Sequence, residues 1–390
     1  MKPLNFKKHL SLLRIYCEKN GFKGWDPYDG LNSPFTKNKL FENSFILRFF
    51  WIQFFKRFPL NLRPILLIKK EYNPKGIALF LSGYCNLYSV SRESSILEVI
   101  KFLSTTLLKH KNDMFSGACW GYNFPWQNRS AYLPTGYPTV VTTSFAANAL
   151  MDAFNCTKNQ EYLDAALSSC KFILKDLKKT KIGKGFVFSY TPMKRDCVYN
   201  ASLLGSRLLS RAFHYTNSTE YLFASKASLL GVISHQNSNG SWYYGRNTNQ
   251  KWIDSFHTGF NLECISEYQK YTKDNSFSEN IVNGFDYYIN NFFLNSEIPK
   301  YFNNRIFPID VHTTSVLVVT LYKLKKITEY SDLVHNCLEY VIKNLQHKKK
   351  GFFFYQKKYF YINKTPYMRW SQAWMFYALS FISLFNKNKL

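Results

Sequence analysis

Residues 157–163 read TKNQEYL, and residues 216–222 read TNSTEYL. Weaker copies of this phrase begin at Thr272 and Thr328, so successive copies are 59, 56 and 56 residues apart. A threonine followed a few residues later by Glu or Asp is typical of a helix start, because the hydroxyl can accept hydrogen bonds from the first free backbone N–H groups. Each copy therefore predicts the start of a helix in an internal repeat.

The residues after each phrase have helical periodicity. In the first copy the apolar stripe consists of Tyr162, Ala165, Ala166, Ser169, Cys170, Ile173 and Leu177. Residues three and four positions apart lie on one face of a helix, so this stripe predicts an amphipathic helix that packs against a core.

A second series of segments runs in step with the first. Glycine followed by aromatic, strand-like residues occurs at 185–190 (GFVFSY), 240–245 (GSWYYG) and 351–355 (GFFFY), and 300–302 (KYF) stands in the corresponding place without its glycine. These segments predict short β-hairpins at one rim. Each is followed by a polar cluster and then by a helix that is low in charge.

The two series together predict six helix pairs. Inner helices are expected at about 75–90, 140–155, 198–215, 256–271, 311–325 and 369–386. Outer helices are expected at about 93–110, 159–178, 218–234, 275–294 and 328–346, and a helix near 4–20 supplies the sixth by packing beside the C-terminal one. Closure is expected because an open array would leave an apolar flank on each terminal repeat.

The predicted fold is therefore all-α, an (α/α)6 toroid of helical hairpins with short β-hairpins at one rim. Residues 1–390 are expected to form a single domain, with an aromatic and basic helical insertion at about 40–70. The alternative is an open helical solenoid, which would be a binding scaffold. Its usual repeat of about 33 to 47 residues is shorter than the spacing found here.

Composition limits the classes of function. The net charge is +26, but the 51 Lys and Arg residues are spread along the chain, whereas nucleic-acid recognition needs them clustered. The eight cysteines form no C-x-x-C pair, the N-terminus carries charges too early for a secretory signal, and no apolar run reaches the roughly 18 to 20 residues of a membrane span. We expect a cytoplasmic protein that binds no nucleic acid.

Metal and cofactor chemistry have no sequence signal. The chain contains no glycine-rich phosphate loop, no H-E-x-x-H sequence and no Cys and His residues clustered at ligand spacing. We therefore predict neither a metal ion nor a cofactor.

Residues 44–68 read SFILRFFWIQFFKRFPLNLRPILLI and carry Arg48, Lys56, Arg57 and Arg63 as their only charges. Such a segment can lie in a membrane interface and contact anionic headgroups. It can equally form an apolar helix packed on the outside of the domain. A peripheral contact with the inner face of the membrane through residues 44–68 is thus one hypothesis, and a packed helix is the other.

In a toroid, the loops that lead into the inner helices converge on one opening. Residues at these positions are rich in Trp, Tyr, His, Asp and Arg: Trp120, Tyr122, Trp126, Gln127, Arg129, Tyr190, Arg195, Asp196, Asn200, Trp242, Tyr243, Asp254, His257, Asp310, His312, Arg369, Trp370 and Gln372. Aromatic faces stack on sugar rings and the polar groups fix hydroxyls and carboxylates, so the set predicts a carbohydrate cleft. Alternatively, the aromatic residues fill the central cavity and the polar ones cap helices.

Two similar motifs stand out among these positions, D-x-x-H-T at Asp254 and His257 and D-x-H-T at Asp310 and His312. Each acid could orient its histidine ring and raise its pKa. The two imidazoles could then act as general base and general acid on a sugar carbon. Alternatively, the two aspartates are the paired carboxylates of glycoside hydrolysis, or they are helix caps beside buried histidines.

Several segments resemble a family encoded in bacterial capsule and exopolysaccharide clusters, the polysaccharide biosynthesis proteins of the VpsJ type. They are GWDPYDGLNS at 24–33, CWGYNFPWQ at 119–127, DSFHTGFNLE at 254–263, PIDVHTTS at 308–315 and YMRWSQAWMFYALS at 367–380. That family is similar to the six-hairpin glycosidase superfamily, which includes unsaturated glucuronyl hydrolases, heparinase-type lyases and sugar epimerases. Thr313, Thr314 and Ser315 depart from the small Ser-Cys-Ala stretch that the family has after the second histidine.

The resemblance adds Asp26, Tyr28 and Asp29 to the candidate site. The hypothesis is a carbohydrate-active enzyme of bacterial surface polysaccharide biosynthesis or trimming, acting on an oligosaccharide or lipid-linked glycan by hydrolysis, lyase elimination or epimerisation. The catalytic candidates are His257, His312, Asp254 and Asp310. The substrate-binding candidates are Asp26, Tyr28, Asp29, Trp120, Tyr122, Trp126, Gln127, Arg129, Tyr190, Trp242, Tyr243, Arg369, Trp370 and Gln372. The rival hypothesis is a non-catalytic glycan-binding or assembly subunit.

Overall fold

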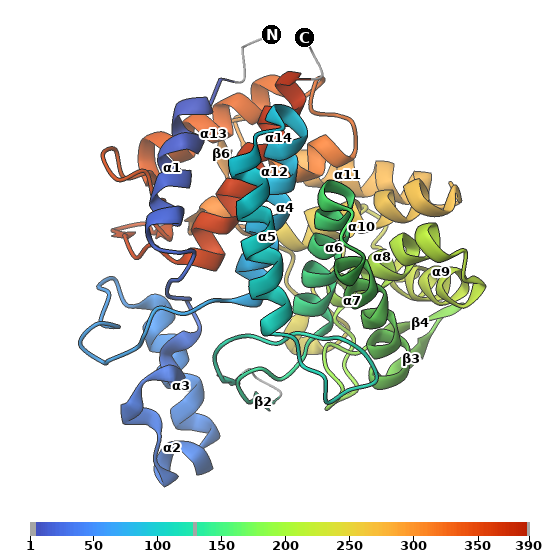
Figure 1. The fold of residues 1–390 in the computed structure, drawn as a ribbon, viewed down its shortest axis with the longest axis horizontal. Helices are drawn as coiled ribbons and strands as arrows, with labels where there is room; N and C mark the ends of the chain where they lie inside the picture. Colours follow the sequence, from blue (N-terminus) through green and yellow to red (C-terminus); the bar gives the residue numbers. More distant parts are fainter. Residues whose placement is uncertain (1–4, 128–130, 388–390) are drawn as a thin grey trace.

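The computed structural model describes residues 5–127 and 131–387. Six inner helices form a closed ring in which each contacts the next and the last contacts the first (Figure 1). They are α4 (Pro74–Ser91), α6 (Val140–Thr157), α8 (Tyr199–Thr216), α10 (Ser255–Thr272), α12 (Val311–Lys323) and α14 (Trp374–Lys387). The predicted toroid is confirmed by the contact between α14 and α4.

Each inner helix except α14 has an outer partner that follows it in the chain. These are α5 (Ser94–Lys109), α7 (Gln160–Lys171), α9 (Thr219–Ile233), α11 (Ser278–Phe292) and α13 (Ser331–Leu345), and α1 (Lys7–Lys19) packs against α14 as the sixth. Two π-helical segments extend this set, η3 (Phe172–Asp176) after α7 and η5 (Met368–Ala373) before α14. The predicted order of inner and outer helices is the observed one.

The inner helices are buried on almost every side because they pack against an outer helix, two neighbours and the lumen. In α6 every residue from Val140 to Met151 is buried, including Thr142, Ser144 and Asn148. Small residues allow the inner helices to approach closely. A Cβ atom added to Gly259 of α10 would lie 2.4 Å from Cγ1 of Val316 on α12.

The repeated threonine phrase marks the turn between an inner and an outer helix. Thr157, Thr216 and Thr272 are the last residues of α6, α8 and α10, so they end inner helices and do not begin outer ones. Each hydroxyl donates to the carbonyl four residues earlier and accepts from the backbone N–H two residues later. The residue after each threonine has a left-handed φ of 55 to 64°, which reverses the chain direction.

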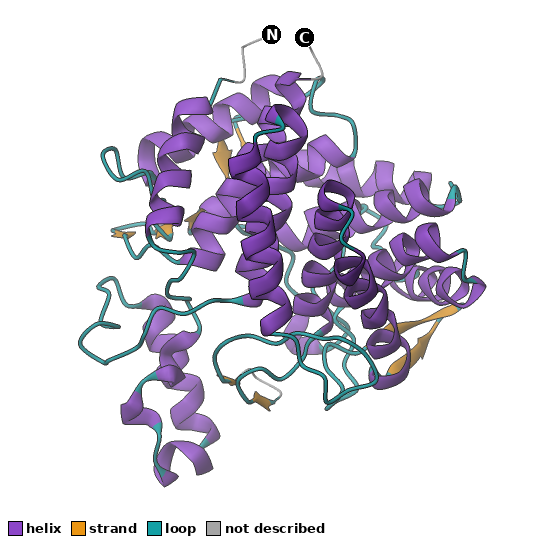
Figure 2. Ribbon diagram, viewed as in Figure 1, coloured by secondary structure: helices purple, strands orange, loops and turns teal. Residues whose placement is uncertain are grey.

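Short antiparallel strands lie outside the helical ring (Figure 2). They form the pairs β1 (Trp126–Gln127) with β2 (Tyr132–Leu133), β3 (Lys179–Ile182) with β4 (Gly185–Phe188) and β5 (Phe293–Leu294) with β6 (Ile298–Pro299), and the sheet of β7 (Ile309–Asp310), β8 (Gln356–Lys357) and β9 (Ile362–Asn363).

Of the predicted hairpin segments, only 185–190 contains a strand, which is β4. Segments 240–245, 300–302 and 351–355 form single β-bridges instead: Gly245 with Val198, Phe302 with Asp254 and Arg305, and Phe353 with Gln346. The predicted hairpins are therefore wrong for these three segments. Gly245 and Phe302 pair with residues distant in the sequence, whereas Phe353 pairs with the nearby Gln346.

The segment between α1 and α4 contains α2 (Lys39–Asn43), α3 (Phe45–Arg57) and two 3-10 turns, η1 (Asp29–Asn32) and η2 (Pro34–Thr36); a further turn, η4 (Thr248–Gln250), precedes α10. Figure 1 shows α2 and α3 standing off from the ring of helices. Ile52 and Phe55 of α3 are buried, whereas Ile46 and Phe50 are 62% and 66% exposed. Among the described residues, no helix has the length and apolar character to cross a bilayer.

Candidate active site at the N-terminal mouth of the ring

The rim where the inner helices begin, here called the N-terminal mouth, collects aromatic side chains from distant parts of the chain. The ring of Tyr28 lies 6.1 Å from Trp126 and 6.0 Å from Trp370, measured between ring centroids. Trp126 lies 6.2 Å from Tyr122 and 6.0 Å from Tyr190. Four of these five rings are partly exposed and Trp370 is buried, so the ring of helices brings these five predicted side chains together.

His257 is the candidate catalytic side chain that reaches the surface. Its Nδ1 lies 2.7 Å from Oδ2 of Asp254, and its side chain is 20% exposed whereas that of Asp254 is 1% exposed. Asp254 also caps α10 by accepting from the backbone N–H of His257, and it accepts from Nε1 of Trp252. The buried carboxylate therefore fixes the imidazole orientation and directs Nε2 away from itself.

Asp310 and His312 form a different arrangement. Asp310 accepts hydrogen bonds from the backbone N–H of His312, from Nε1 of Trp370 and from Nε2 of Gln356, and does not contact the imidazole through its side chain. Burial raises the pKa of Asp310 to about 6. The two D-x-H motifs are thus not equivalent, because only Asp254 orients its histidine ring.

The imidazole of His312 is buried in an aromatic box. Its ring centroid lies 4.6 Å from Phe256 and 4.5 Å from Trp374, and neither ring nitrogen has a hydrogen-bond partner among the described residues. Burial lowers the pKa of His312 well below its usual value. The side chain is therefore a neutral imidazole beneath the mouth.

Asp26, Asp29 and Arg369 are engaged in buried ion pairs. Arg369 contacts Asp26 through two bonds, from Nε to Oδ2 at 2.6 Å and from Nη2 to Oδ1 at 2.8 Å. Nε of Arg63 lies 2.6 Å from Asp29, and burial raises the pKa of Asp29 to about 6. These pairs hold residues 26–29 against η5, which places the Tyr28 ring across the mouth.

The remaining predicted residues mostly lie behind the mouth. Four of them are buried: Trp120, Trp242, Gln127 and Gln372. Nε1 of Trp120 donates to the Leu107 carbonyl. The side-chain amide of Gln372 accepts from the backbone N–H of Phe353 and donates to its carbonyl. Tyr243 is half-buried beneath the ammonium of Lys251. Arg129 lies outside the described residues. Trp120, Trp242 and Gln372 support the walls of the mouth and do not face the surface.

Lys75 is a buried side chain that the sequence analysis missed. Its Nζ lies 4.4 Å from the ring centroid of Phe145, 5.5 Å from Phe260 and 5.6 Å from Trp374, with no carboxylate within 4.0 Å among the described residues. Burial, followed by the charge of Arg369, lowers the pKa of Lys75 well below its usual value. The available signal was a lysine directly after Pro74 at the start of an otherwise apolar helix.

Asp196 was placed at the rim by its sequence position, but it had no assigned role. Its Oδ1 accepts from the backbone N–H of Tyr190 at 2.7 Å, and burial raises its pKa to about 6. Burial raises the pKa of Tyr244, and the nearby charges of Asp196 and Asp254 raise it further, so the two carboxylates lie near the same side chain. The ring of Tyr244 lies 4.8 Å from that of His257.

The described part of the mouth thus offers proton-transfer chemistry. It contains an exposed imidazole held by a buried carboxylate, a second carboxyl with a raised pKa and a surround of half-exposed aromatic rings. Among the described residues, no three His, Cys, Asp or Glu side chains are grouped as metal ligands would be. This combination can move protons on a bound ligand and stack against its apolar faces.

No protein-family model and no curated protein sequence matches the chain. Among solved structures, a cellobiose 2-epimerase from Bacillus thermoamylovorans is 13% identical, with a TM-score of 0.62 over 82% of this chain and 88% of that chain. The GH76 alpha-mannanase of Bacteroides thetaiotaomicron is 14% identical, with a TM-score of 0.63 over 83% and 88%. An unsaturated glucuronyl hydrolase from Streptococcus agalactiae is 10% identical, with a TM-score of 0.62 over 98% and 90%. This chain shares the (α/α)6 toroid fold of these structures.

Proposed function

We propose that this protein is a carbohydrate-active enzyme that acts on an oligosaccharide or a lipid-linked glycan at the N-terminal mouth. The observation that carries the proposal is the His257 imidazole, which is partly exposed and oriented by a buried Asp254 at 2.7 Å. A histidine held in this way can accept or donate a proton near neutral pH. The fold is a framework for many chemistries, so the proposal depends on this site.

The half-buried aromatic rings of the N-terminal mouth would bind the sugar. Tyr28, Tyr122, Trp126 and Tyr190 are half-buried, so each offers a ring face or edge to a ligand while its remainder is packed. Sugar C–H groups stack on such faces, and the tyrosine hydroxyls can hydrogen-bond sugar hydroxyls. Arg369 contributes indirectly, because its ion pair with Asp26 positions Tyr28.

Asp196 is the proposed partner in proton transfer. A carboxyl with a pKa of about 6 is partly protonated near neutral pH, so it can donate a proton while His257 accepts one. Hydrolysis, elimination and epimerisation can each use such a pair. Asp310 and His312 are proposed to support Trp370 and the floor of the mouth.

The resemblance of the motifs to VpsJ-type proteins favours a role in assembly or trimming of bacterial surface polysaccharide, with the protein at the cytoplasmic face of the membrane. The exposed apolar face of α3 supports a peripheral contact through residues 44–68. Ile46, Phe50 and Phe54 lie four residues apart on that face, and each is at least 42% exposed. Arg57 and Lys69 are exposed beside this segment and could contact anionic headgroups.

The rival function is a non-catalytic glycan-binding subunit. It is favoured by the burial of His312 and by the commitment of Arg369 to Asp26, which leave one exposed imidazole where two were expected. It predicts binding of the cognate glycan without any product.

The deciding experiment incubates the purified protein with the polysaccharide made by the neighbouring genes of its organism and follows mass and ultraviolet absorbance. A new double bond identifies a lyase, added water a hydrolase, and unchanged mass with altered stereochemistry an epimerase. His257→Gln should reduce the rate on the order of 10²-fold or more. His110→Gln, at an exposed histidine beside Tyr72, is the control and should be neutral. Equal rates for His257→Gln and the parent would refute the histidine mechanism.

A further inference from the structure

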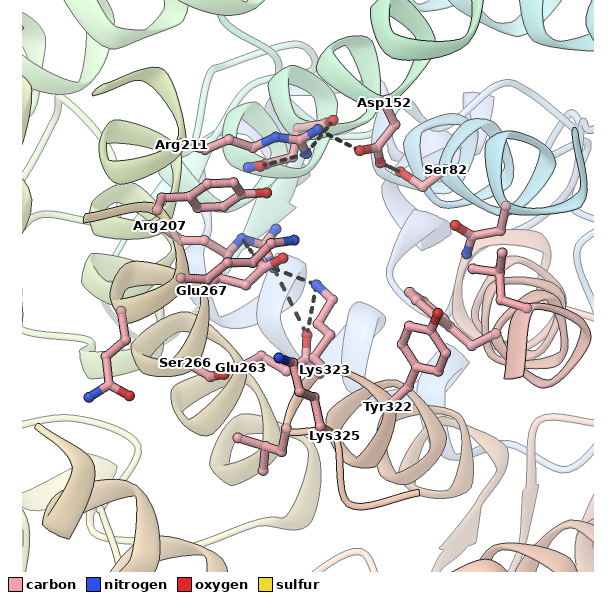
Figure 3. Close-up of a pocket in the computed structure, with 18 of the residues that line it drawn as sticks. Ser82, Asp152, Arg207, Arg211, Glu263, Ser266, Glu267, Tyr322, Lys323 and Lys325 are labelled. Atoms are coloured by element: carbon pink, nitrogen blue, oxygen red, sulfur yellow. Dashed lines mark hydrogen bonds and ion pairs between the residues drawn. The ribbon is translucent and has the colours of Figure 1, made fainter. Parts of the chain in front are cut away.

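The opposite end of the ring, here called the C-terminal mouth, contains a cavity of about 1210 Å³ (Figure 3). It is lined by residues of all six inner helices and reaches inward to Phe145. We infer that this cavity is a second ligand site, separate from the N-terminal mouth, which binds a polyhydroxylated anion: a sugar that carries a phosphate or carboxylate group.

One wall of the cavity carries a network of buried charges. Nζ of Lys323 lies 3.2 Å from Glu267 and 3.5 Å from Glu263, and Nε of Arg207 lies 3.4 Å from Glu267. In Figure 3 these side chains point into a common space. The Arg207 Nε–H is outside hydrogen-bonding geometry with any described residue although it is buried. Nε of Arg207 is thus ion-paired with Glu267 but not hydrogen-bonded. A buried guanidinium N–H without a hydrogen bond is costly, and an anionic or hydroxyl oxygen in the cavity would satisfy it.

A second ion pair lies across the same space. Nη2 of Arg211 lies 2.7 Å from Oδ1 of Asp152, whose Oδ2 accepts from the hydroxyl of Ser82 at 2.7 Å. Asn148 accepts from Arg211 through its backbone carbonyl at 3.1 Å. Each carboxylate in the cavity is therefore paired with a cation of the protein, so none of them remains to attract a cationic ligand.

The lining has an excess of positive charge. Six cationic side chains, Arg207, Arg211, Lys270, Lys273, Lys323 and Lys325, face three carboxylates, Asp152, Glu263 and Glu267. Lys270, Lys273 and Lys325 are exposed at the entrance. Because the inner charges are paired, the excess lies at the entrance, where it attracts anions and holds the charged end of a ligand.

Hydroxyl and amide groups complete the lining and favour a sugar over a simple anion. Tyr271 of α10 and Tyr377 of α14 line the cavity, and neither hydroxyl bonds to another described residue. Asn86 and Asn155 also line it. The volume of the cavity lies somewhat above the usual range of about 300 to 1,000 Å³ for small-molecule sites, so it has room for a sugar derivative.

Phe145 separates the two ends of the lumen. Cζ of Arg207 lies 5.4 Å from the centroid of this ring, and Nζ of Lys75 lies 4.4 Å from it. Phe145 and Arg207 line the cavity, whereas Lys75 does not. A ligand in the cavity would thus be bounded by Phe145 and would not contact His257.

The test is isothermal titration calorimetry of the whole chain at low salt with glucose 6-phosphate, glucuronic acid and neutral glucose. We expect at least one of the two anions to bind, and the tighter of them identifies the charged group that the site prefers. Neutral glucose should bind about tenfold more weakly or not at all. Lys325→Gln and Tyr377→Phe should each weaken anion binding by about threefold or more. Lys326→Gln is the matched control, because Lys326 pairs with Glu329 and does not line the cavity.

His257→Gln should leave the anion affinity unchanged. Absence of binding for both anions up to about 10 mM would overturn the inference. Binding that is lost in His257→Gln but kept in Lys325→Gln would place the anion at the other mouth and would overturn it equally. An equal loss in Lys325→Gln and Lys326→Gln would indicate attraction by overall charge and no site.

Discussion

At the scale of single residues, the two aspartate–histidine motifs have diverged in geometry although they look alike in sequence. The three-residue spacing from Asp254 to His257 places the imidazole over its carboxylate. The two-residue spacing from Asp310 to His312 lets the carboxylate cap the helix while the ring turns into the lumen. One residue of spacing therefore separates an oriented surface histidine from a buried one.

This difference predicts the effect of Asp254→Asn. Asparagine caps a helix about as well as aspartate, so the free energy of unfolding should fall by about 1 kcal/mol or less. An amide at this position favours the wrong tautomer of His257, so kcat on the cognate glycan should fall on the order of 10²- to 10⁴-fold. Urea unfolding and steady-state kinetics measure the two quantities. Unchanged kcat would contradict the assigned pair.

Asp310 predicts a pH dependence of stability. Its pKa is about 6 in the folded protein against an ordinary 3.8. A carboxyl with a raised folded pKa stabilises the fold fully below about pH 4, and this contribution is lost as the pH rises through about 6. The parent should therefore lose about 1 to 3 kcal/mol of unfolding free energy relative to Asp310→Asn between pH 4 and 7.

Urea titrations at several pH values measure that difference. Asp29 and Asp196 also have pKa values of about 6, but they titrate in both proteins and cancel in the comparison. Parallel stability curves for the parent and Asp310→Asn would show that Asp310 does not titrate in this range.

At the scale of elements, the repeat was predictable because it is local. Stripes three and four residues apart and breaks every 55 to 59 residues identify helices without any knowledge of their partners. The threonine phrase correctly marks the junctions, but it was predicted to begin the outer helix. In the structure the threonine hydroxyl caps the end of the inner helix, and the left-handed residue after it begins the turn. The rim strands were less predictable because most of them are only two residues long, which is too short to show an alternating pattern.

The contact between α10 and α12 depends on a glycine. A methyl group at Gly259 would lie 2.4 Å from Val316 and 2.9 Å from Thr320, whereas one at Gly205 of α8 would meet its nearest atom at 3.2 Å. Gly259→Ala should therefore lower the unfolding free energy by about 1 to 3 kcal/mol. Gly205→Ala should cost less, because alanine also favours the helix. Chemical denaturation measures the unfolding free energy of both variants. Equal losses would show that α10 and α12 can move apart to accommodate the added methyl group at no extra cost.

At the scale of the whole molecule, ring closure could be predicted from the count of helix pairs, but the contents of the lumen could not. The ion pair between Asp26 and Arg369 joins residues 343 apart. No local sequence pattern indicates that this pair positions Tyr28 across the mouth. The charges of the C-terminal mouth had a readable signal, since Arg207 and Arg211, and Glu263 and Glu267, lie four residues apart within inner helices otherwise low in charge.

The exposed face of α3 predicts vesicle binding by the intact protein. Phe50 is 66% exposed on this face, so Phe50→Asp should abolish cosedimentation with vesicles that contain anionic lipid, without changing the unfolding free energy by more than about 0.5 kcal/mol. Ile15→Asp, at a similarly exposed position on α1, is the control and should bind as the parent does. Binding that survives Phe50→Asp would remove residues 44–68 as a membrane contact.

The packing of α1 against α14 has a consequence for biosynthesis. Helix α1 is synthesised long before α14, so its apolar face has no partner until α14 has left the ribosome. Until then, apolar surface stays exposed at both ends of the growing helical array. Chaperone binding during translation should therefore persist until α14 has been synthesised, and should fall sharply once α14 packs against α1.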